Sequence, residues 1–161
     1  MKIIFIAVMV SSFVFSSCAQ SRHNIISAKA FYQEKISGVA IADDNGQVMG
    51  STPDTLRWLI IECKGTERPM IDSVFFFGKV YTPNISSLHE YPILTGKRKS
   101  DGKDAAISTR PGNRLWRVEL TLHAIDHSFK GSQIVLTGIA SGKRFWMTVK
   151  TVMELEAEIR G

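Results

Sequence analysis

The stretch RLWRVELTL, residues 114–122, indicates the fold class because apolar and polar side chains alternate along it. Its apolar residues are Trp116, Val118, Leu120 and Leu122. The polar residues between them are Arg117, Glu119 and Thr121. Successive side chains of a β-strand point to opposite faces, so this spacing predicts a strand with one face in a core and the other in water.

The C-terminal run repeats the same alternation. Its apolar residues are Met153, Leu155, Ala157 and Ile159, and the residues between them are Glu154, Glu156 and Glu158. A helix would scatter these apolar side chains around its circumference, so we expect a second strand despite the good helix formers.

Two central runs are apolar on both faces. In residues 56–64, one face carries Leu56, Trp58 and Ile60, and the other carries Leu59, Ile61 and Cys63. Residues 74–81 hold three consecutive phenylalanines, at 75, 76 and 77. Such runs suit strands that are covered on both sides. We expect residues 65–70 to join them as a hairpin loop.

Turn residues divide the rest of the chain. The pairs Asn45-Gly46, Asp101-Gly102 and Ser141-Gly142 each separate two apolar segments and favour two-residue hairpin turns. We place the five prolines, at 53, 69, 83, 92 and 111, in loops or at strand ends, because proline cannot donate to a sheet.

Together these signals indicate about nine short strands, of which the first spans residues 28–36, and no convincing long helix. We therefore predict an all-β fold: an antiparallel β-sandwich of immunoglobulin-like architecture with 8–9 strands, or alternatively a small closed β-barrel. Residues 28–161 are expected to form one domain, near the commonest single-domain size.

Residues 1–19 have the layout of an export signal, with one cation at Lys2, an apolar run and a tail of small residues. Phe15-Ser16-Ser17-Cys18 resembles the lipobox of bacterial lipoproteins, although that motif usually carries an aliphatic residue where Phe15 stands. The resemblance implies lipidation of Cys18. Ordinary cleavage before Gln20 is the alternative, and residues 20–27 would form a short tether.

Charge gives a limited indication of partners. The chain has 20 basic and 15 acidic residues, a net charge of +5, and the leader removes only Lys2. An excess this small in an exported protein argues against nucleic acid as a partner. An anionic envelope ligand or a protein partner fits better.

Much of the excess lies in one segment, whose candidate binding residues are Lys97, Arg98, Lys99, Lys103 and Arg110. If the hairpin at Asp101-Gly102 projects from the sheet, these cations can meet lipid phosphates, acidic polysaccharide or an acidic protein. A solvated loop that protects a sheet edge is the alternative.

We identify no catalytic constellation, metal site or cofactor motif. His123 and His127 are four apart but follow a strand, so a metal-assisted hydrolase with a distant His89 is only the alternative function. Cys63 shares a strand face with Leu59 and Ile61, which predicts a buried, unreactive thiol.

Asp54-Thr55-Leu56 and Asp72-Ser73-Val74 each resemble an O-glycosylation signal of Gram-negative envelope proteins, which makes Thr55 and Ser73 candidate acceptors. The sequence as a whole predicts an exported protein of a Gram-negative cell envelope, held on a membrane through Cys18. We expect a non-catalytic binding or accessory role. A soluble secreted protein and a purely structural envelope protein are the alternatives.

Overall fold

The computed structural model describes residues 24–37, 41–42, 48–49, 54–125, 132–140 and 142–160. These residues contain strands and no helix. The strands are β1 (Ile25–Ser37), β2 (Ile41–Ala42), β3 (Val48–Met49), β4 (Asp54–Lys64), β5 (Ile71–Phe76), β6 (Lys79–Leu88), β7 (Ile93–Lys97), β8 (Asp104–Ile107), β9 (Asn113–Ile125), β10 (Ile134–Ala140), β11 (Lys143–Val149) and β12 (Thr151–Arg160). The all-β prediction is confirmed.

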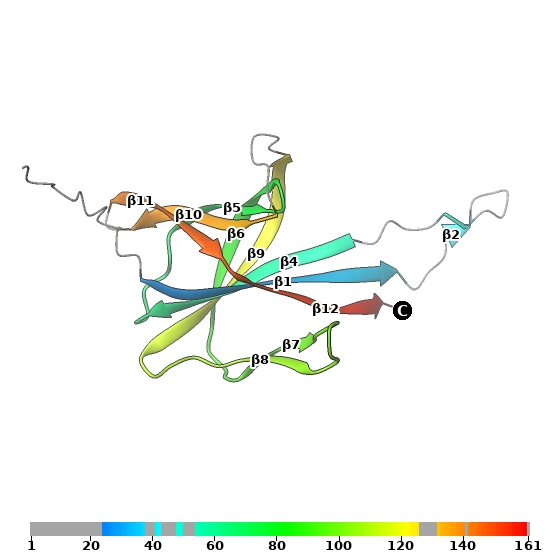
Figure 1. Ribbon diagram of the computed structural model, residues 1–161, viewed down its shortest axis with the longest axis horizontal. Coiled ribbons are helices and arrows are strands. Elements are labelled where there is room, and N and C mark those ends of the chain that lie inside the picture. The colour runs from blue at the N-terminus through cyan, green and yellow to red at the C-terminus, as the bar shows by residue number, and fades with distance from the viewer. Residues whose placement is uncertain are drawn as a thin grey trace, which may run out of the picture.

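Eight strands form one curled sheet in the order β11-β10-β5-β6-β9-β4-β1-β12 (Figure 1). The pairs β2–β3 and β7–β8 form two small separate sheets. Neighbours in the large sheet are antiparallel except β1 and β12, which run parallel. The sheet is therefore mixed, whereas the sequence predicted antiparallel pairing throughout.

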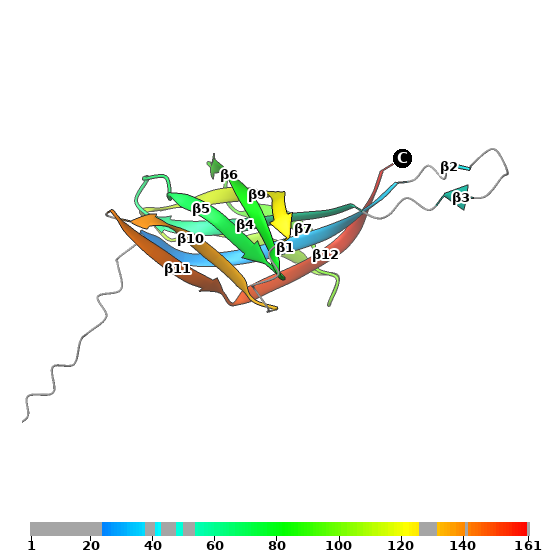
Figure 2. The same ribbon diagram turned by 90° about the horizontal axis from the view of Figure 1, so that it is seen from above.

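The parallel pair follows from how the chain crosses the sheet. Strands β11 and β12 are the two edge strands, and only Lys150 separates them in sequence. The chain passes directly from one edge of the curled sheet to the other (Figure 2). The two edges therefore converge at Lys150, which gives the fold the form of a half-barrel with a small second layer.

The sheet has a hydrophobic cluster on each face. The inner cluster extends from β1 to β11 and includes Leu59, Ile61, Phe76, Trp116 and Phe145. The outer cluster includes Phe31, Trp58, Ile60, Leu115 and Leu155, and the β7–β8 hairpin covers it with Ala105 and Ile107. Strand β4 contributes to both clusters, with the division between its two faces that the sequence predicted.

The run at 74–81 is not one strand, so that prediction is wrong. Phe77 and Gly78 have positive φ angles, 49° and 76°, and form a two-residue turn in which Phe76 pairs with Lys79. Positive φ at both central positions matches the twist of a tight hairpin. Residues 65–70 lead from β4 to β5, but these strands do not pair, so the hairpin expected there is also wrong.

Strand β6 was not expected, and the prediction that Pro83 lies in a loop or at a strand end is wrong, because it lies inside β6 opposite Leu120 of β9. Strand β5 pairs only with residues 79–81 of β6, so Pro83 lies beyond that ladder, where a missing N–H costs little. Leu122, assigned to the core face, is exposed. The register between β6 and β9 shifts by one residue next to it, which disturbs the alternation.

Each of the other turn signals lies between two paired strands, but only Ser141-Gly142 is a two-residue connection, between Ala140 and Lys143. The two-residue turn predicted at Asp101-Gly102 is wrong, because four residues separate the Arg98–Lys103 pair. Strands β2 and β3 pair on either side of Asn45-Gly46, although the turn residues themselves lie outside the described ranges. Gly102 (φ 66°) lies between β7 and β8, and Gly142 (φ 74°) lies between β10 and β11.

Candidate functional site

The β7–β8 hairpin, which carries most of the candidate cations, lies against the large sheet and does not project from it. Ile93, Ala105 and Ile107 pack into the outer cluster. Arg98 forms a β-bridge with Leu155 of β12. Hydrophobic packing and backbone hydrogen bonding therefore both hold the hairpin next to β12.

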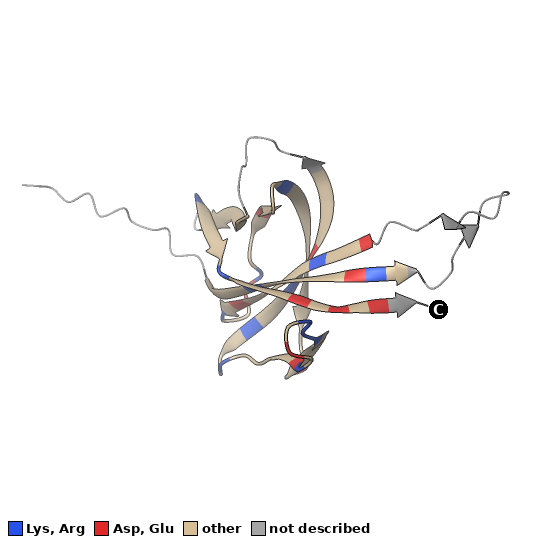
Figure 3. Ribbon diagram, turned by 45° about the vertical axis from the view of Figure 1, so that its right-hand side comes forward, with Lys and Arg blue, Asp and Glu red and all other residues tan. Residues whose placement is uncertain are grey.

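Acidic residues of the same chain pair with two cations at the hairpin tip. Arg98 Nη2 lies 2.9 Å from Asp101 Oδ2, and Lys99 Nζ lies 2.5 Å from Glu154 Oε1. The backbone N–H of Lys99 also donates to the Glu154 carbonyl oxygen at 2.9 Å. Figure 3 shows the acidic positions along β12 and the mixed charges of the hairpin beside it.

Glu154 is the centre of this contact, because the Tyr32 hydroxyl donates to its Oε2 at 2.9 Å. The hydrogen bonds from Lys99 and Tyr32 lower the pKa of Glu154, and the same carboxylate raises the pKa of Lys99. Burial and Glu154 together raise the pKa of Tyr32. The Lys99–Glu154 pair is therefore charged at neutral pH, and part of the basic patch is neutralised within the chain.

The candidate cations do not form one continuous patch. Lys97 pairs with Asp104 and Arg98 with Lys103 across the hairpin, so Lys97 and Lys103 lie on opposite faces of it. Neither lysine forms an ion pair with any described residue. Arg110 lies apart from the tip, where its backbone N–H donates to Glu62 of β4.

Among the described side chains, Glu62 is the one charged residue that is buried, with 8% of its surface exposed. Its Oε1 accepts hydrogen bonds from Asn113 Nδ2 at 2.7 Å and from the Arg110 N–H at 3.1 Å, and Ser27 Oγ donates to Oε2. Burial alone would raise the pKa of Glu62, but these hydrogen bonds outweigh it and lower the pKa. The cluster fixes the loop between β8 and β9 and serves structure.

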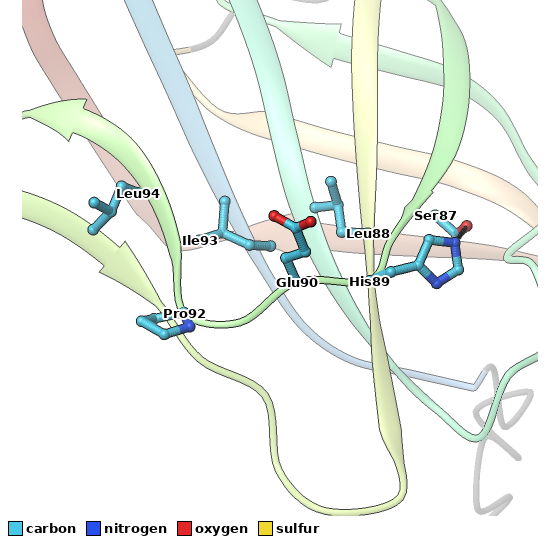
Figure 4. Close-up of a pocket in the computed structure, with 7 residues that line it drawn as sticks. All are labelled: Ser87, Leu88, His89, Glu90, Pro92, Ile93 and Leu94. Atoms are coloured by element: carbon cyan, nitrogen blue, oxygen red, sulfur yellow. Dashed lines mark hydrogen bonds between the residues drawn. The ribbon is translucent and has the colours of Figure 1, made fainter.

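An open pocket of ≈ 460 Å³ lies where β6 passes into β7 (Figure 4). Its polar side chains are Ser87, His89 and Glu90, and its apolar side chains come from Leu88, Pro92, Ile93 and Leu94. Tyr91 braces this segment, since its hydroxyl donates to the Leu88 carbonyl oxygen at 2.7 Å and accepts from the Leu115 N–H at 3.3 Å. Sequence reasoning missed this pocket, because no pattern marks the packing of two strand ends.

Ser87 Oγ and His89 Nε2 lie 2.8 Å apart at one end of this pocket, a contact between a hydroxyl and a base. Nucleophilic catalysis needs in addition a group that orients the histidine and donors for an oxyanion. Within the described residues, no hydrogen bond is made to the other ring nitrogen of His89. The pair therefore places a hydroxyl and an imidazole side by side at the wall of the pocket.

The histidines that the alternative hydrolase requires do not converge in the described part of the chain. His89 follows Leu88, which pairs with Leu115, whereas His123 precedes Ala124, which pairs with Val80. The strand rise separates these two ends of the ladder by about 25 Å. His89 and His123 cannot bind one ion, and His127 lies outside the described residues. Within those residues, three or more potential ligands are not grouped anywhere.

Cys63 is fully buried in the inner cluster. Burial, together with the charge of neighbouring Glu62, raises the pKa of the thiol to about 12. A protonated, inaccessible thiol is not a nucleophile.

The modification candidates are placed unequally. Thr55 lies one residue inside the start of β4 and is half-buried, opposite Glu34. Ser73 lies inside β5, opposite Thr137 of β10, and is half-buried. Cys18 and the leader lie outside the described residues.

Comparison of the chain with protein-family models, with curated proteins and with solved structures found no match. In the part of the chain that the structure describes, no helix has the length and apolar character needed to cross a membrane.

Proposed function

We propose that this chain is an exported binding or accessory protein of a Gram-negative cell envelope, anchored to a membrane by lipid on Cys18 and acting without catalysis. The observation that carries the proposal is the leader, in which the apolar run ends in Phe15-Ser16-Ser17-Cys18. Several acyl chains on one residue would hold the protein on a bilayer, since each buried methylene contributes about 0.8 kcal/mol.

A packed domain that begins soon after the leader supports this function. Strand β1 begins at Ile25, so residues 25–27 of the expected 20–27 tether belong to the sheet, and the residues before Ile25 would connect it to the anchor. Two hydrophobic clusters then hold the surface loops on a fixed scaffold. Recognition would use these loops. The β7–β8 hairpin is the first surface to test, and its proposed ligand is an anionic component of the envelope.

The geometry of the hairpin decides which residues a binding test must change. Lys99 holds the hairpin to Glu154, so its replacement alters docking as well as charge. Lys97 and Lys103 form no ion pair with described residues and are exposed. A Lys97→Gln/Lys103→Gln variant therefore removes charge that is free to meet a ligand and leaves the docking contact in place.

The test is capture from envelope extract by the wild-type protein and by this double variant. Lys79→Gln/Lys143→Gln, two exposed lysines on other strands, is the matched control for net charge. We expect the hairpin variant to lose its bound component and the control to keep it. Equal capture by all three proteins would remove the hairpin from the proposal, and membrane fractionation of Cys18→Ala tests the anchor separately.

A further inference from the structure

A shelf of side chains on the outer face of β5, β10 and β11 has the composition of a sugar-binding surface. Trp146 is 67% exposed and projects from the middle of edge strand β11. Thr137 lies opposite it on β10, and Ser73 lies opposite Thr137 on β5. With Phe75 and Arg144, these side chains line a shallow hollow of ≈ 180 Å³.

We propose that this Trp146 shelf binds an acidic sugar residue, with the ring stacked on the indole and the carboxylate on Arg144. The inference deepens the proposed binding function by naming a ligand class, and it uses a surface separate from the β7–β8 hairpin.

The shape of the shelf favours a flat ring with a polar rim. The row from Trp146 through Thr137 to Ser73 spans two strand spacings, about 10 Å. The hollow is smaller than the roughly 300–1,000 Å³ of pockets that enclose drug-sized ligands. A galactopyranose-type ring presents the C–H groups of carbons 3, 4 and 5 on one face, and these pack on the electron-rich face of an indole.

The polar groups suit the edge of such a ring. The Ser73 hydroxyl makes no hydrogen bond with a described residue, and Thr137 Oγ1 donates only a long one, 3.4 Å, to the Ser73 carbonyl oxygen. Both hydroxyls are therefore free to bond a sugar. The centre of a protein interface would instead be more apolar and would lack this border of hydroxyls around its aromatic residue.

Arg144 sets the charge of the ligand. It lies two residues from Trp146 on the same face of β11 and is exposed, and it forms no ion pair with a described residue. A guanidinium recognises a carboxylate through two parallel hydrogen bonds. A uronic acid supplies both the apolar ring face and the carboxylate.

The backbone under the shelf is held rigidly, which limits the entropy lost on binding. On the inner side, the Phe145 ring packs over Gly138, so that a Cβ built at position 138 would lie 2.8 Å from it. The Ile139 N–H donates to the Met70 carbonyl oxygen at 3.0 Å. The side chains above are therefore presented on a fixed surface.

The experiment titrates the protein with trigalacturonic acid and with its methyl ester, which is the neutral counterpart. Binding is followed by the NMR signal of the Trp146 indole N–H and by calorimetry. Trp58 and Trp116 are buried, so a ligand on the surface reaches only the Trp146 ring. We expect saturable binding of the acid at millimolar concentrations and weaker binding of the ester.

Three exposed positions provide the variants. Arg144→Gln should weaken binding of the acid about tenfold and leave binding of the ester unchanged. Trp146→Ala should abolish both. Leu94→Ala, at a residue equally exposed at 67% but far from the shelf, should change neither.

The proposal is overturned if wild-type protein shows no saturable shift with trigalacturonic acid, if the ester binds as tightly as the acid, or if Leu94→Ala loses binding as Trp146→Ala does. An equal indole shift with a short acidic peptide would also overturn it in favour of a protein ligand. Capture through the hairpin is measured separately with Lys97→Gln/Lys103→Gln, so failure of the shelf leaves the proposed function standing.

Discussion

Asn113 donates a hydrogen bond from Nδ2 to Glu62 Oε1 at 2.7 Å, and this contact ties the start of β9 to the end of β4. The Arg110 N–H donates to the same oxygen, so one buried carboxylate fixes the turn that connects the β7–β8 hairpin to β9. The placement of the hairpin over the outer cluster therefore depends on this residue as well as on apolar packing.

We predict that Glu62→Ala lowers the free energy of unfolding by about 1–2 kcal/mol, because the part-buried hydrogen bonds from the Arg110 N–H and the Asn113 amide lose their acceptor. Urea denaturation at neutral pH measures the change. Glu67→Ala, at an exposed loop position, is the control and should stay within about 0.5 kcal/mol of wild type. A Glu62→Ala protein as stable as this control would contradict the role of the cluster.

The same carboxylate makes stability depend on pH. Folding lowers the pKa of Glu62, so its contribution is complete above its unfolded pKa of about 4.3 and is lost as the pH falls through the lower folded value. Glu62→Gln cannot titrate. Between about pH 5 and pH 2, we expect the stability of wild type to fall more steeply than that of Glu62→Gln. Parallel curves would contradict the lowered pKa.

The alternation of side chains and the turn residues made much of the fold predictable. The division of β4 between two hydrophobic faces followed from period two alone, as did the strands around 114–122 and 153–159. Gly78 was also a usable signal, because a lone glycine inside an apolar strand pattern often marks a turn or bulge. Three adjacent phenylalanines obscured it.

The pairing of distant strands was not predictable, because alternation specifies faces and not neighbours. Nothing in residues 151–160 indicates a parallel partner at residues 29–37. The docking of the hairpin on β12 also depends on tertiary packing. For Glu62 a signal existed, since one carboxylate inside the buried run 58–63 requires buried donors.

Lys99→Gln should loosen the hairpin locally while the sheet stays folded. The side chain holds Glu154, and the Lys99 N–H donates to the Glu154 carbonyl oxygen. Native-state hydrogen exchange should show faster exchange of the Arg98 and Lys99 amides and no change in β4. Lys97→Gln is the control, because Lys97 belongs to the same hairpin but forms no ion pair with a described residue. Equal protection of the Arg98 and Lys99 amides in the two variants would contradict the contact.

Gly138→Ala should destabilise the fold severely, by about 3 kcal/mol or more. A Cβ at this position would lie 2.1 Å from the Met70 carbonyl oxygen, so backbone must shift. Gly112→Ala is the matched control, because nothing lies within 4 Å of its Cβ and only its positive φ of 81° is penalised. Thermal unfolding compares the stabilities of the two variants. A loss of no more than about 1 kcal/mol in the free energy of unfolding for both would contradict the close packing around Gly138.

Cys63 should resist modification until the protein unfolds. Its thiol is buried and its pKa is raised to about 12. In a Cys18→Ser variant Cys63 is the only thiol, so the reaction with a thiol reagent at neutral pH reports it alone. We expect no reaction in native protein and full reaction in urea. Rapid native labelling would show that the inner cluster opens.

Intact-mass analysis of the mature protein purified from membranes determines whether the protein is anchored to the envelope through lipid. We expect an N-terminal Cys18 that carries a thioether-linked diacylglycerol. A mature chain that begins at Gln20 without lipid would contradict the anchor and make this a soluble secreted protein.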